Sequence, residues 1–543
     1  MKNTIYLLMI FMLLSSCYDD KGNYDYIAVN EVDVQLPSSF GLRLGDTTLV
    51  IRPEISQSMR DGYKHLQFYW QHSTVNFASV VAKEADTLSL ADTVALRIDP
   101  DDKNLKYEHY LRLNVYDEEN DILYPYQTKV SIVKPFNGAW MVLHKQEGET
   151  RLGSVEYIDG KPLVTKDAYY EMTGKKLHGE PLCLGCHEGV VTTYWRAGNY
   201  VYNGFSVVTN DPDEAGIYTQ WKKFEKNDSL SRMVAPAYRE MINYQGITQY
   251  ESNASASVCL SDGVLYQGGH GLKLYKAPVN NNVKGEVYLS QAASVGFISM
   301  YYDKIGRRFL NYYYYNNIHS IDPLIFNEAG NQETLNPIPA RPTNVQYGIV
   351  DPNAIPLGQE VIYIGHGYQY GPSMTGAGNR MYCYAYALGD NNKSYVWEFR
   401  SYGIISSSDV AFSGYYEIDT PAGIDENTCF ASSMAYNGIL FYAWGNKIYR
   451  LDFTASGGMT SVLYAHPDGG NVSKMKFAKS GAVNSSLDYP GGTWHPNRTL
   501  AVVLDKNDGT SDLVVLNLST SGKAENVSQY KGDFGKIKDI VFL

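Results

Sequence analysis

A short pattern recurs along the second part of the chain, and it restricts the fold more than any other feature. In each copy a glycine opens a turn, and an apolar residue and a tyrosine follow at fixed offsets. Asp262-Gly263 and Asn437-Gly438, which precede two of the copies, supply the positive φ angles that tight hairpin turns need. The copies are Gly198–Tyr202, Gly271–Tyr275, Gly378–Tyr382 and Gly445–Tyr449.

Hairpins that recur at intervals of tens of residues indicate a β-propeller, in which each blade is a small antiparallel sheet. Short alternating runs broken by Gly, Asn and Asp dominate the chain, and convincing amphipathic helices are scarce. We therefore expect an all-β fold with a propeller at residues 136–543. We expect about seven blades, and eight blades are nearly as well supported. Two successive β-sandwiches are the alternative, and the repetition of hairpins makes it the weaker one.

One further turn, Asp505 to Asp512, separates the apolar runs Leu500 to Leu504 and Leu513 to Leu518. Asp505-Lys506-Asn507-Asp508-Gly509 resembles the first half of an EF-hand calcium loop, but Leu516 stands where that loop needs a glutamate. A hairpin turn is therefore the preferred interpretation, and no metal site is predicted.

Residues 28–135 contain a separate set of strand-like runs. The run Phe68-Tyr69-Trp70 places a large aromatic residue mid-strand, where a sandwich domain commonly buries one between its sheets. About 100 residues with this many strands fit an immunoglobulin-like β-sandwich, and Asn137-Gly138 offers a boundary turn before the propeller. The expected strands are Val32–Leu36, Thr48–Ile55, Leu66–His72, Thr93–Ile98, His109–Tyr116 and Tyr126–Val133.

The first residues predict a lipoprotein signal peptide at residues 1–16. Lys2 gives a positive start, and the apolar run Ile5 to Leu14 is too short to span a bilayer but suits a signal-peptide core. The run ends in Leu14-Ser15-Ser16-Cys17, as lipoprotein signal peptidase requires; an ordinary secretory signal ending near a Cys is the alternative. Cys17 would then carry the acyl chains that hold residues 17–27, as a tether, to outer membrane lipid.

Asp19 and Asp20 follow the cysteine at once. They resemble the acidic export signal that sends lipoproteins of the Bacteroidetes to the outer face of the cell, although a plain solvated tether is the alternative. The formal net charge is -12 and no basic block occurs, so nucleic acid is a poor partner. We therefore expect a protein anchored to the cell outer membrane and facing the extracellular side.

The segment Cys17 to Tyr26 resembles the mature start of the PKD-like family lipoproteins of Bacteroidetes. The strand with Phe68-Tyr69-Trp70 and the segment Gly138 to Leu143 are similar to theirs as well. The resemblance covers the whole chain, and it implies a PKD-like sandwich and an accessory role in a SusC/SusD-type nutrient uptake system with a TonB-dependent channel. It brings no catalytic residues, and its ligands are mostly undefined.

Cys183-Leu184-Gly185-Cys186-His187 is the sharpest local motif. It matches the pattern for attachment of c-type haem, in which two thiols add to the vinyl groups and the His ligates iron. The motif lies between expected strands with no helical haem domain around it. A local disulfide, two free thiols or half of a zinc site are therefore alternatives, and no cofactor is predicted. Cys259, Cys383 and Cys429 lie in apolar strand patterns and are expected to be small buried residues.

Aromatic residues in turn-like segments are better candidates for a ligand surface, because flat rings stack on sugars or peptide side chains at little entropic cost. No Ser-centred elbow, phosphate loop or metalloprotease helix appears in the sequence. The preferred hypothesis is a non-catalytic surface lipoprotein that binds an oligosaccharide or a peptide for nutrient import. A glycan or peptide hydrolase is the alternative, and a c-type haem protein is a weaker one. The candidate contacts are Tyr194, Trp195, Tyr368, Tyr370, Tyr489 and Trp494.

Overall fold

The computed structural model divides into two compact units, Met1–Phe40 with Asp46–Ser131, and Gly41–Gly45 with Ile132–Leu543. Nearly all of its regular structure is β-strand, as predicted, and no helix of the described residues is long and apolar enough to cross a membrane. The structure describes residues 29–43, 48–78, 85–99, 105–133, 135–136, 138–158, 161–194, 198–219, 224, 226–230, 240–250, 257–268, 286–295, 298–313, 336–337, 350–370, 380–401, 410–478 and 494–543.

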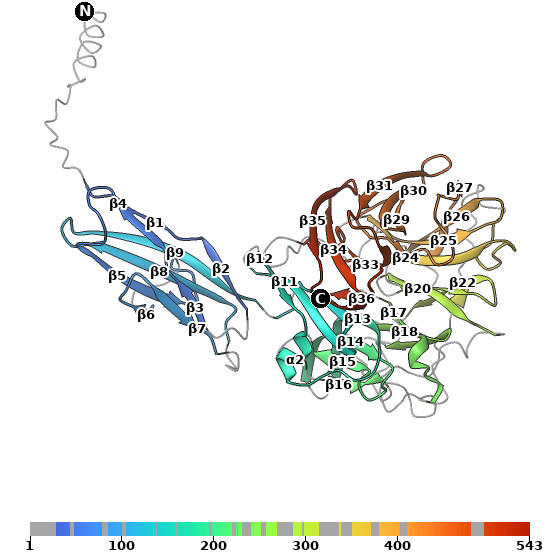
Figure 1. Ribbon diagram of the computed structural model, residues 1–543, viewed down its shortest axis with the longest axis horizontal. Helices are drawn as coiled ribbons and strands as arrows, with labels where there is room; N and C mark the ends of the chain where they lie inside the picture. Colours follow the sequence, from blue (N-terminus) through green and yellow to red (C-terminus); the bar gives the residue numbers. More distant parts are fainter. Residues whose placement is uncertain are drawn as a thin grey trace, which may run out of the picture. The chain divides into compact units, whose positions relative to one another are not determined.

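The first unit is a β-sandwich. One sheet has the strand order β2-β9-β8-β5-β6, and the pairs β1–β4 and β3–β7 complete the unit (Figure 1). Trp70 on β5 is fully buried together with Leu113 and Val115 of β8, which confirms the mid-strand aromatic predicted from the sequence. The strands are β1 (Val32–Gln35), β2 (Ser39–Arg43), β3 (Thr48–Ile51), β4 (Glu54–Gln57), β5 (Leu66–Ser73), β6 (Asp86–Ser89), β7 (Val94–Arg97), β8 (Glu108–Asp117) and β9 (Ile122–Val133).

The second unit is a β-propeller, in which seven sheets of the described residues follow one another around a ring (Figure 1). We number them blades 1 to 7. Blades 2 to 7 each use strands that are consecutive in sequence, whereas blade 1 combines β10, β11 and β12 with β36. β36 pairs antiparallel with β10, with Phe542 opposite Trp140. Figure 1 shows this closure as red β36 beside the cyan strands of the same blade.

The strand bounds follow the chain around the ring. Blade 1 has β10 (Trp140–Gln146), β11 (Glu149–Ile158), β12 (Lys161–Thr165) and β36 (Lys536–Phe542), and helix α2 (Ala168–Thr173) follows β12. Blade 2 has β13 (Pro181–Tyr194), β14 (Gly198–Thr209), β15 (Gly216–Thr219) and β16 (Lys226–Ser229). Blade 3 has the short 3-10 helix η2 (Tyr244–Gly246), β17 (Ile247–Tyr250), β18 (Ser257–Ser261) and β19 (Val264–Gly268).

The remaining blades have four strands each. Blade 4 has β20 (Leu289–Val295), β21 (Ile298–Asp303), β22 (Arg308–Tyr313) and β23 (Asn336–Pro337). Blade 5 has β24 (Glu360–Tyr370), β25 (Arg380–Leu388), β26 (Lys393–Ser401) and β27 (Val410–Asp419). Blade 6 has β28 (Phe430–Ala431), β29 (Ile439–Trp444), β30 (Lys447–Asp452) and β31 (Met459–Ala465), and blade 7 has β32 (Asn471–Phe477), β33 (Thr499–Asp505), β34 (Ser511–Leu518) and β35 (Ala524–Tyr530).

Blade 1 buries both faces of strand β10 against the neighbouring blades, which explains why this strand begins with an apolar run without alternation. On β10, Met141 and Leu143 pack into the core shared with blade 2, while Trp140 and Val142 pack into the core shared with blade 7. Because successive residues of a strand point to opposite faces, both sets have to be apolar.

The turn chemistry predicted from the sequence is confirmed at two hairpins. Asp262-Gly263 joins β18 and β19, and both residues have positive φ, 48° and 76°. The turn between Asp505 and Ser511 joins β33 and β34, with Gly509 at φ 83°, so the hairpin interpretation of this segment is correct.

Candidate ligand-binding cavity

The propeller has a cavity of about 410 Å³ around its axis that opens to solvent. Its described lining comes from the inner strand of every blade or from a residue next to that strand, namely β36, β13, β17, β20, β24, β28 and β32. The volume falls in the range of small-molecule sites. The cavity is therefore a candidate ligand site to which all seven blades contribute.

A β-bulge at an equivalent place in five inner strands determines which residues line this cavity. In each strand the pairing register skips one residue, which bends the strand and redirects the side chains beside the bulge. The skipped residues are Leu182, Ser290, Ile362, Ser473 and Lys538. The residues that follow them all line the cavity: Cys183, Gln291, Tyr363, Lys474 and Asp539. These five equivalent positions, which we call the bulge layer, carry a thiol, an amide, a phenol, an ammonium and a carboxylate.

Asp539 connects three inner strands. Its Oδ1 lies 2.9 Å from Nζ of Lys476 and 3.9 Å from Nζ of Lys474, both on β32. Its Oδ2 accepts a hydrogen bond from the backbone N–H of Leu184 on β13 at 2.8 Å. Burial of Asp539 acts to raise the pKa of its carboxyl, but the charges of Lys476 and Lys474 and the Leu184 N–H outweigh it and hold that pKa below its usual value. Asp539 is therefore an ionised carboxylate at neutral pH.

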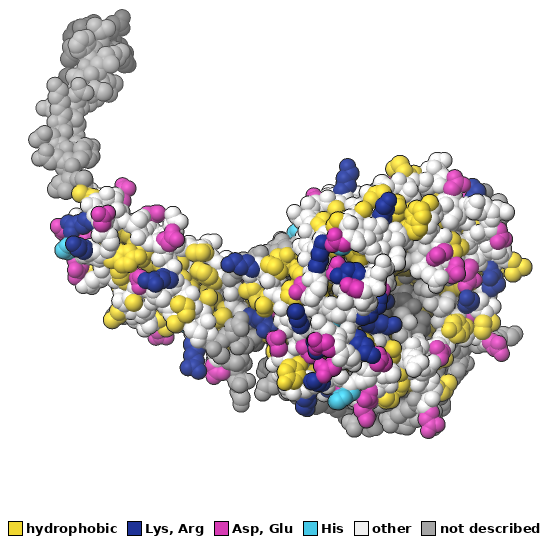
Figure 2. Space-filling view, viewed as in Figure 1, with side chains coloured by type: hydrophobic (Ala, Val, Ile, Leu, Met, Phe, Trp, Pro, Cys, Tyr) yellow, Lys and Arg dark blue, Asp and Glu magenta, His cyan; other side chains and the backbone are white. Residues whose placement is uncertain are grey.

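The cavity carries an excess of positive charge. The charge of Asp539 raises the pKa of Lys474 against the opposing effect of burial, so this ammonium stays protonated. Lys538, the bulge residue of β36, is exposed and also lines the cavity. Three lysines face one carboxylate among the described lining residues, an excess of two positive charges when His366 is neutral. Figure 2 shows dark blue Lys and Arg side chains bordering the hollow of this unit.

The opposite wall offers neutral hydrogen-bonding groups and an aromatic face. The hydroxyls of Tyr363 and Ser432 lie 2.8 Å apart, and the Tyr363 ring stacks on Phe430 with centroids 5.4 Å apart. Gln245 and Gln291 add side-chain amides to the lining. The cavity can therefore hold a ligand through hydrogen bonds and charge together.

The aromatic contacts predicted from the sequence do not gather at this cavity. Trp494 is 2% exposed and packs edge-on against Tyr157 and Phe542 in the core between blades 7 and 1. This burial contradicts the ligand contact expected of Trp494. Neighbouring Gly and Pro residues signal a turn, but they do not determine whether a side chain in that turn is exposed.

Tyr368 and Tyr370 lie on β24 and Tyr194 lies on β13, so the structure places all three in strands rather than in the expected turns. Tyr368 is half-buried, and its backbone N–H donates to the hydroxyl of Tyr384 at 3.4 Å. The side chains of Tyr194 and Tyr370, and the whole of Trp195 and Tyr489, lie outside the described residues.

The sequence predicts that the motif Cys183 to His187 lies between strands. In the structure it forms part of strand β13. Cys183 packs into the core that contains Ile247, whereas Cys186 packs into the different core that contains Phe205. Residues three apart on a strand point to opposite faces, so the two thiols cannot reach one haem edge, one zinc ion or each other. This geometry contradicts the haem, half-zinc and local-disulfide interpretations, and both residues are thiols. The side chain of His187 lies outside the described residues.

The other cysteines follow the expectation in part. Cys383 is buried, as predicted, and burial raises the pKa of its thiol. Cys429 is only partly buried, and desolvation raises the pKa of its thiol to about 11. Cys259 lies on β18, but its side chain is outside the described residues, as are Cys17, Asp19 and Asp20 of the expected lipidation and export signals.

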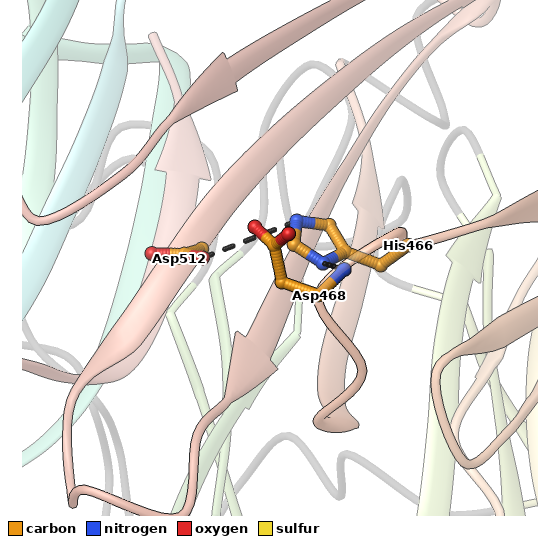
Figure 3. Close-up of side chains that lie close together, drawn as sticks. All are labelled: His466, Asp468 and Asp512. Carbon is orange, nitrogen blue, oxygen red and sulfur yellow. Dashed lines mark hydrogen bonds and ion pairs between the residues drawn. The ribbon is translucent and has the colours of Figure 1, made fainter.

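His466, Asp468 and Asp512 bring an imidazole and two carboxylates together where blades 6 and 7 meet (Figure 3). Nε2 of the buried His466 lies 3.9 Å from Oδ2 of Asp512. However, Lys506 pairs with Oδ1 of Asp512 at 2.8 Å, and Lys531 pairs with Asp468. Nδ1 of His466 accepts the backbone N–H of Asp468 at 3.3 Å, which leaves the proton on Nε2, the atom that a metal would need. The cluster therefore joins two blades by charge pairing and is a poor metal site.

The cavity lysines were not found from the sequence. Lys474 and Lys476 occupy alternate positions of a short strand, the pattern of an ordinary solvated face. An alignment of the inner strands on their bulges places Lys474 and Asp539 at equivalent positions. The bulges, however, can be identified only from the strand pairing in the structure.

Comparison with known protein families supports the N-terminal part of this architecture. A sequence model of the PKD-like family matches residues 17–181, which contain the sandwich and β10 to β12 of the propeller. No curated protein matches the sequence. The chain is thus an all-β protein in which a PKD-like N-terminal region precedes a β-propeller.

Several solved structures are similar to this chain at low identity. A Quinonprotein alcohol dehydrogenase-like protein from Bacteroides thetaiotaomicron is 13% identical with a TM-score of 0.39, covering 95% of this chain and 100% of that one. AztD from Citrobacter koseri is 10% identical with a TM-score of 0.33, covering 88% and 97%. An apocarotenoid oxygenase from Synechocystis is 10% identical with a TM-score of 0.35, covering 75% and 92%. All three scores are low, so the propeller assignment rests on the sheet order and strand pairing.

Proposed function

We propose that this chain is a lipid-anchored protein of the outer cell surface that binds a nutrient ligand, an oligosaccharide or a peptide, without converting it. The bound ligand would be passed to a SusC/SusD-type TonB-dependent importer. The observation that carries the proposal is the axial cavity of about 410 Å³, to which every blade contributes and whose wall combines amides, hydroxyls, an aromatic face and lysines. Such a wall suits recognition of a polar small molecule.

The charge state of the cavity favours binding over hydrolysis. A general acid works best with a pKa near the operating pH, whereas Asp539 has a lowered pKa and is bonded to Lys476 and Leu184. Hydrolysis of a glycosidic bond commonly uses a pair of carboxyl groups, and Asp539 is the single carboxylate among the described lining residues.

The N-terminal part supports the proposed location. Cys17 ends a lipoprotein-type signal, and the sandwich that follows the tether would act as a spacer and docking arm. The match to the PKD-like family and the resemblance to Bacteroidetes lipoproteins agree with this role. A Cys17→Ser variant should lose acylation and appear in the soluble fraction.

A tagged pull-down from gently solubilised outer membranes, with mass spectrometry of the retained proteins, tests the proposal. Recovery of a TonB-dependent channel and its lid in near-equal amounts would support it, and the cargo of that channel would give the ligand class. Recovery of the chain alone, together with turnover of a polymer by the purified protein, would instead establish the hydrolase alternative.

A further inference from the structure

We propose that the ligand of the axial cavity is an acidic oligosaccharide, and that Lys538 and Lys474 bind its carboxylate or sulfate group. This inference rests on the proposed function and names the chemical class that the cavity would recognise. It follows from three observations: the unequal use of the two lysines of β32, the bulge that presents Lys538, and the neutral polar groups on the facing wall.

The two lysines of β32 do not pair equally closely with Asp539. Lys476 is the closer partner, 2.9 Å from Oδ1 and 3.1 Å from Oδ2, and its side chain is 18% exposed. Lys474 is 3.9 Å from Oδ1 and 41% exposed, so its ammonium keeps donors directed at solvent. Lys476 therefore satisfies the buried carboxylate, and Lys474 is available to a second anion.

Lys538 is presented by a feature of the backbone. It is the residue that the pairing of β36 with β10 skips, with Leu143 opposite Asp539 and His144 opposite Ile537. A bulge redirects a side chain that a regular strand would place otherwise, and bulges are frequent beside functional sites. No ion pair of Lys538 is present in the described part of the chain, so its positive charge adds to that of Lys474.

The rest of the lining suits a sugar. Gln245, Thr248 and Gln291 supply amides and a hydroxyl that can donate to and accept from sugar hydroxyls. An acidic sugar presents both kinds of partner at once, a carboxylate or sulfate for the lysines and hydroxyls for the neutral wall. A neutral sugar would leave the excess of two positive charges uncompensated inside the cavity.

Calorimetric titration of the full mature chain tests the inference with four probes. They are trigalacturonate, its methyl ester, a sulfated chondroitin disaccharide and triglutamate. We expect one of the two acidic sugars to bind, and binding to weaken as salt is raised. Lys538→Gln should reduce that affinity about tenfold while the unfolding temperature stays unchanged. Lys536→Gln removes the same charge two residues away in β36, outside the cavity lining, and should change affinity less than about twofold.

The outcomes separate this inference from the proposed function. If only the neutral ester binds, or only triglutamate, the proposed capture role stands and the acidic-sugar inference is overturned. Binding of an acidic sugar that Lys538→Gln and Lys536→Gln weaken equally would also overturn it, because the effect would then come from net charge and not from the cavity. If neither acidic sugar binds, the acidic-sugar inference is overturned as well. The proposed function itself is tested separately, by the membrane pull-down.

Discussion

The carboxylate of Asp539 accepts a hydrogen bond from the backbone N–H of Leu184 at 2.8 Å, across 355 residues of sequence. The same carboxylate pairs with Lys476, so it connects β36, β13 and β32 at the place where the ring of blades closes. One residue therefore contributes both to the closure of the propeller and to the charge of its cavity.

We expect Asp539→Asn to lower the free energy of unfolding by about 2–3 kcal/mol. Removing one partner of a buried ion pair leaves the other charges uncompensated, and the partial exposure of Lys474 and Lys476 reduces the usual cost. The side-chain oxygen of asparagine can still accept the hydrogen bond from the Leu184 N–H. The loss of stability therefore measures the effect of removing the negative charge. Urea unfolding at neutral pH measures it.

Asp468→Asn is the matched control, because its carboxylate is 53% exposed and pairs with one lysine. Its cost should be much smaller than that of Asp539→Asn, because solvent screens an exposed ion pair. Equal losses in the two variants would contradict the role given to Asp539.

His144 should make the propeller less stable as pH falls. It is fully buried on β10, its Nε2 donates to the carbonyl of Lys166 at 2.8 Å, and its Nδ1 accepts the N–H of Gly535. Burial lowers its pKa from 6.5 to about 4. Between these values the unfolded chain binds a proton that the folded chain does not. Stability present above pH 6.5 is therefore lost as the pH falls towards 4, by about 2–3 kcal/mol at pH 4.5.

Urea midpoints measured from pH 7.5 to 4.5 test this prediction. The His144→Gln variant has no titrating ring, so its stability should fall less steeply over the same range. Parallel curves for the two proteins would show that other groups cause the pH dependence.

Trp494 should matter for stability and not for ligand binding. Trp494→Ala removes a ring packed on Tyr157 and Phe542, and we expect it to cost about 3–5 kcal/mol of unfolding free energy. Trp444→Ala is the comparison, because Trp444 is 51% exposed at the end of β29 and should cost less than about 1 kcal/mol. A stable Trp494→Ala protein with impaired ligand binding would restore the original interpretation of this residue.

The cluster of His466, Asp468 and Asp512 should not retain a divalent metal. Lys506 and Lys531 already neutralise its carboxylates, and the proton of His466 occupies Nε2. Elemental analysis after incubation with zinc and dialysis should find only traces, and a chelator should leave the unfolding temperature unchanged. Stoichiometric zinc that disappears in Asp512→Asn would refute this expectation.

Local features of the fold were predictable because their causes are local. The positive φ angles at Asp262-Gly263 and the hairpin before Ser511 follow from turn chemistry, and buried Trp70 follows from its place in a strand. Strands β2 and β6 are short edge strands of their sheet; β2 has a single buried residue and β6 has none, so neither has the apolar alternation that predicts a strand. The closure by β36 could not be predicted because it depends on pairing with a strand about 400 residues earlier, such as Phe542 with Trp140.

The candidate site was largely beyond sequence-based prediction. Aromatic residues suit sugars, but a turn-like sequence does not show whether a ring is exposed, and Trp494 packs into the core between blades 7 and 1. The spacing of Cys183 to His187 matches the haem-attachment pattern, whereas the strand conformation of the segment separates the two thiols. Lys474 and Asp539 come together only when the ring is closed, and nothing local links them.

The bulge layer contains residues of both kinds: Asp539 joins neighbouring blades, whereas Gln291, Tyr363 and Lys474 line the cavity. Under the proposed function, exchanging Gln291, Tyr363 or Lys474 would alter what the cavity recognises, while the apolar residues of the neighbouring cores would keep the ring intact. Ligand preference could then diverge during evolution through single replacements at these three positions. Two propellers of this kind with the same blades would then not have to bind the same ligand, and the residues after the bulges are the ones to compare.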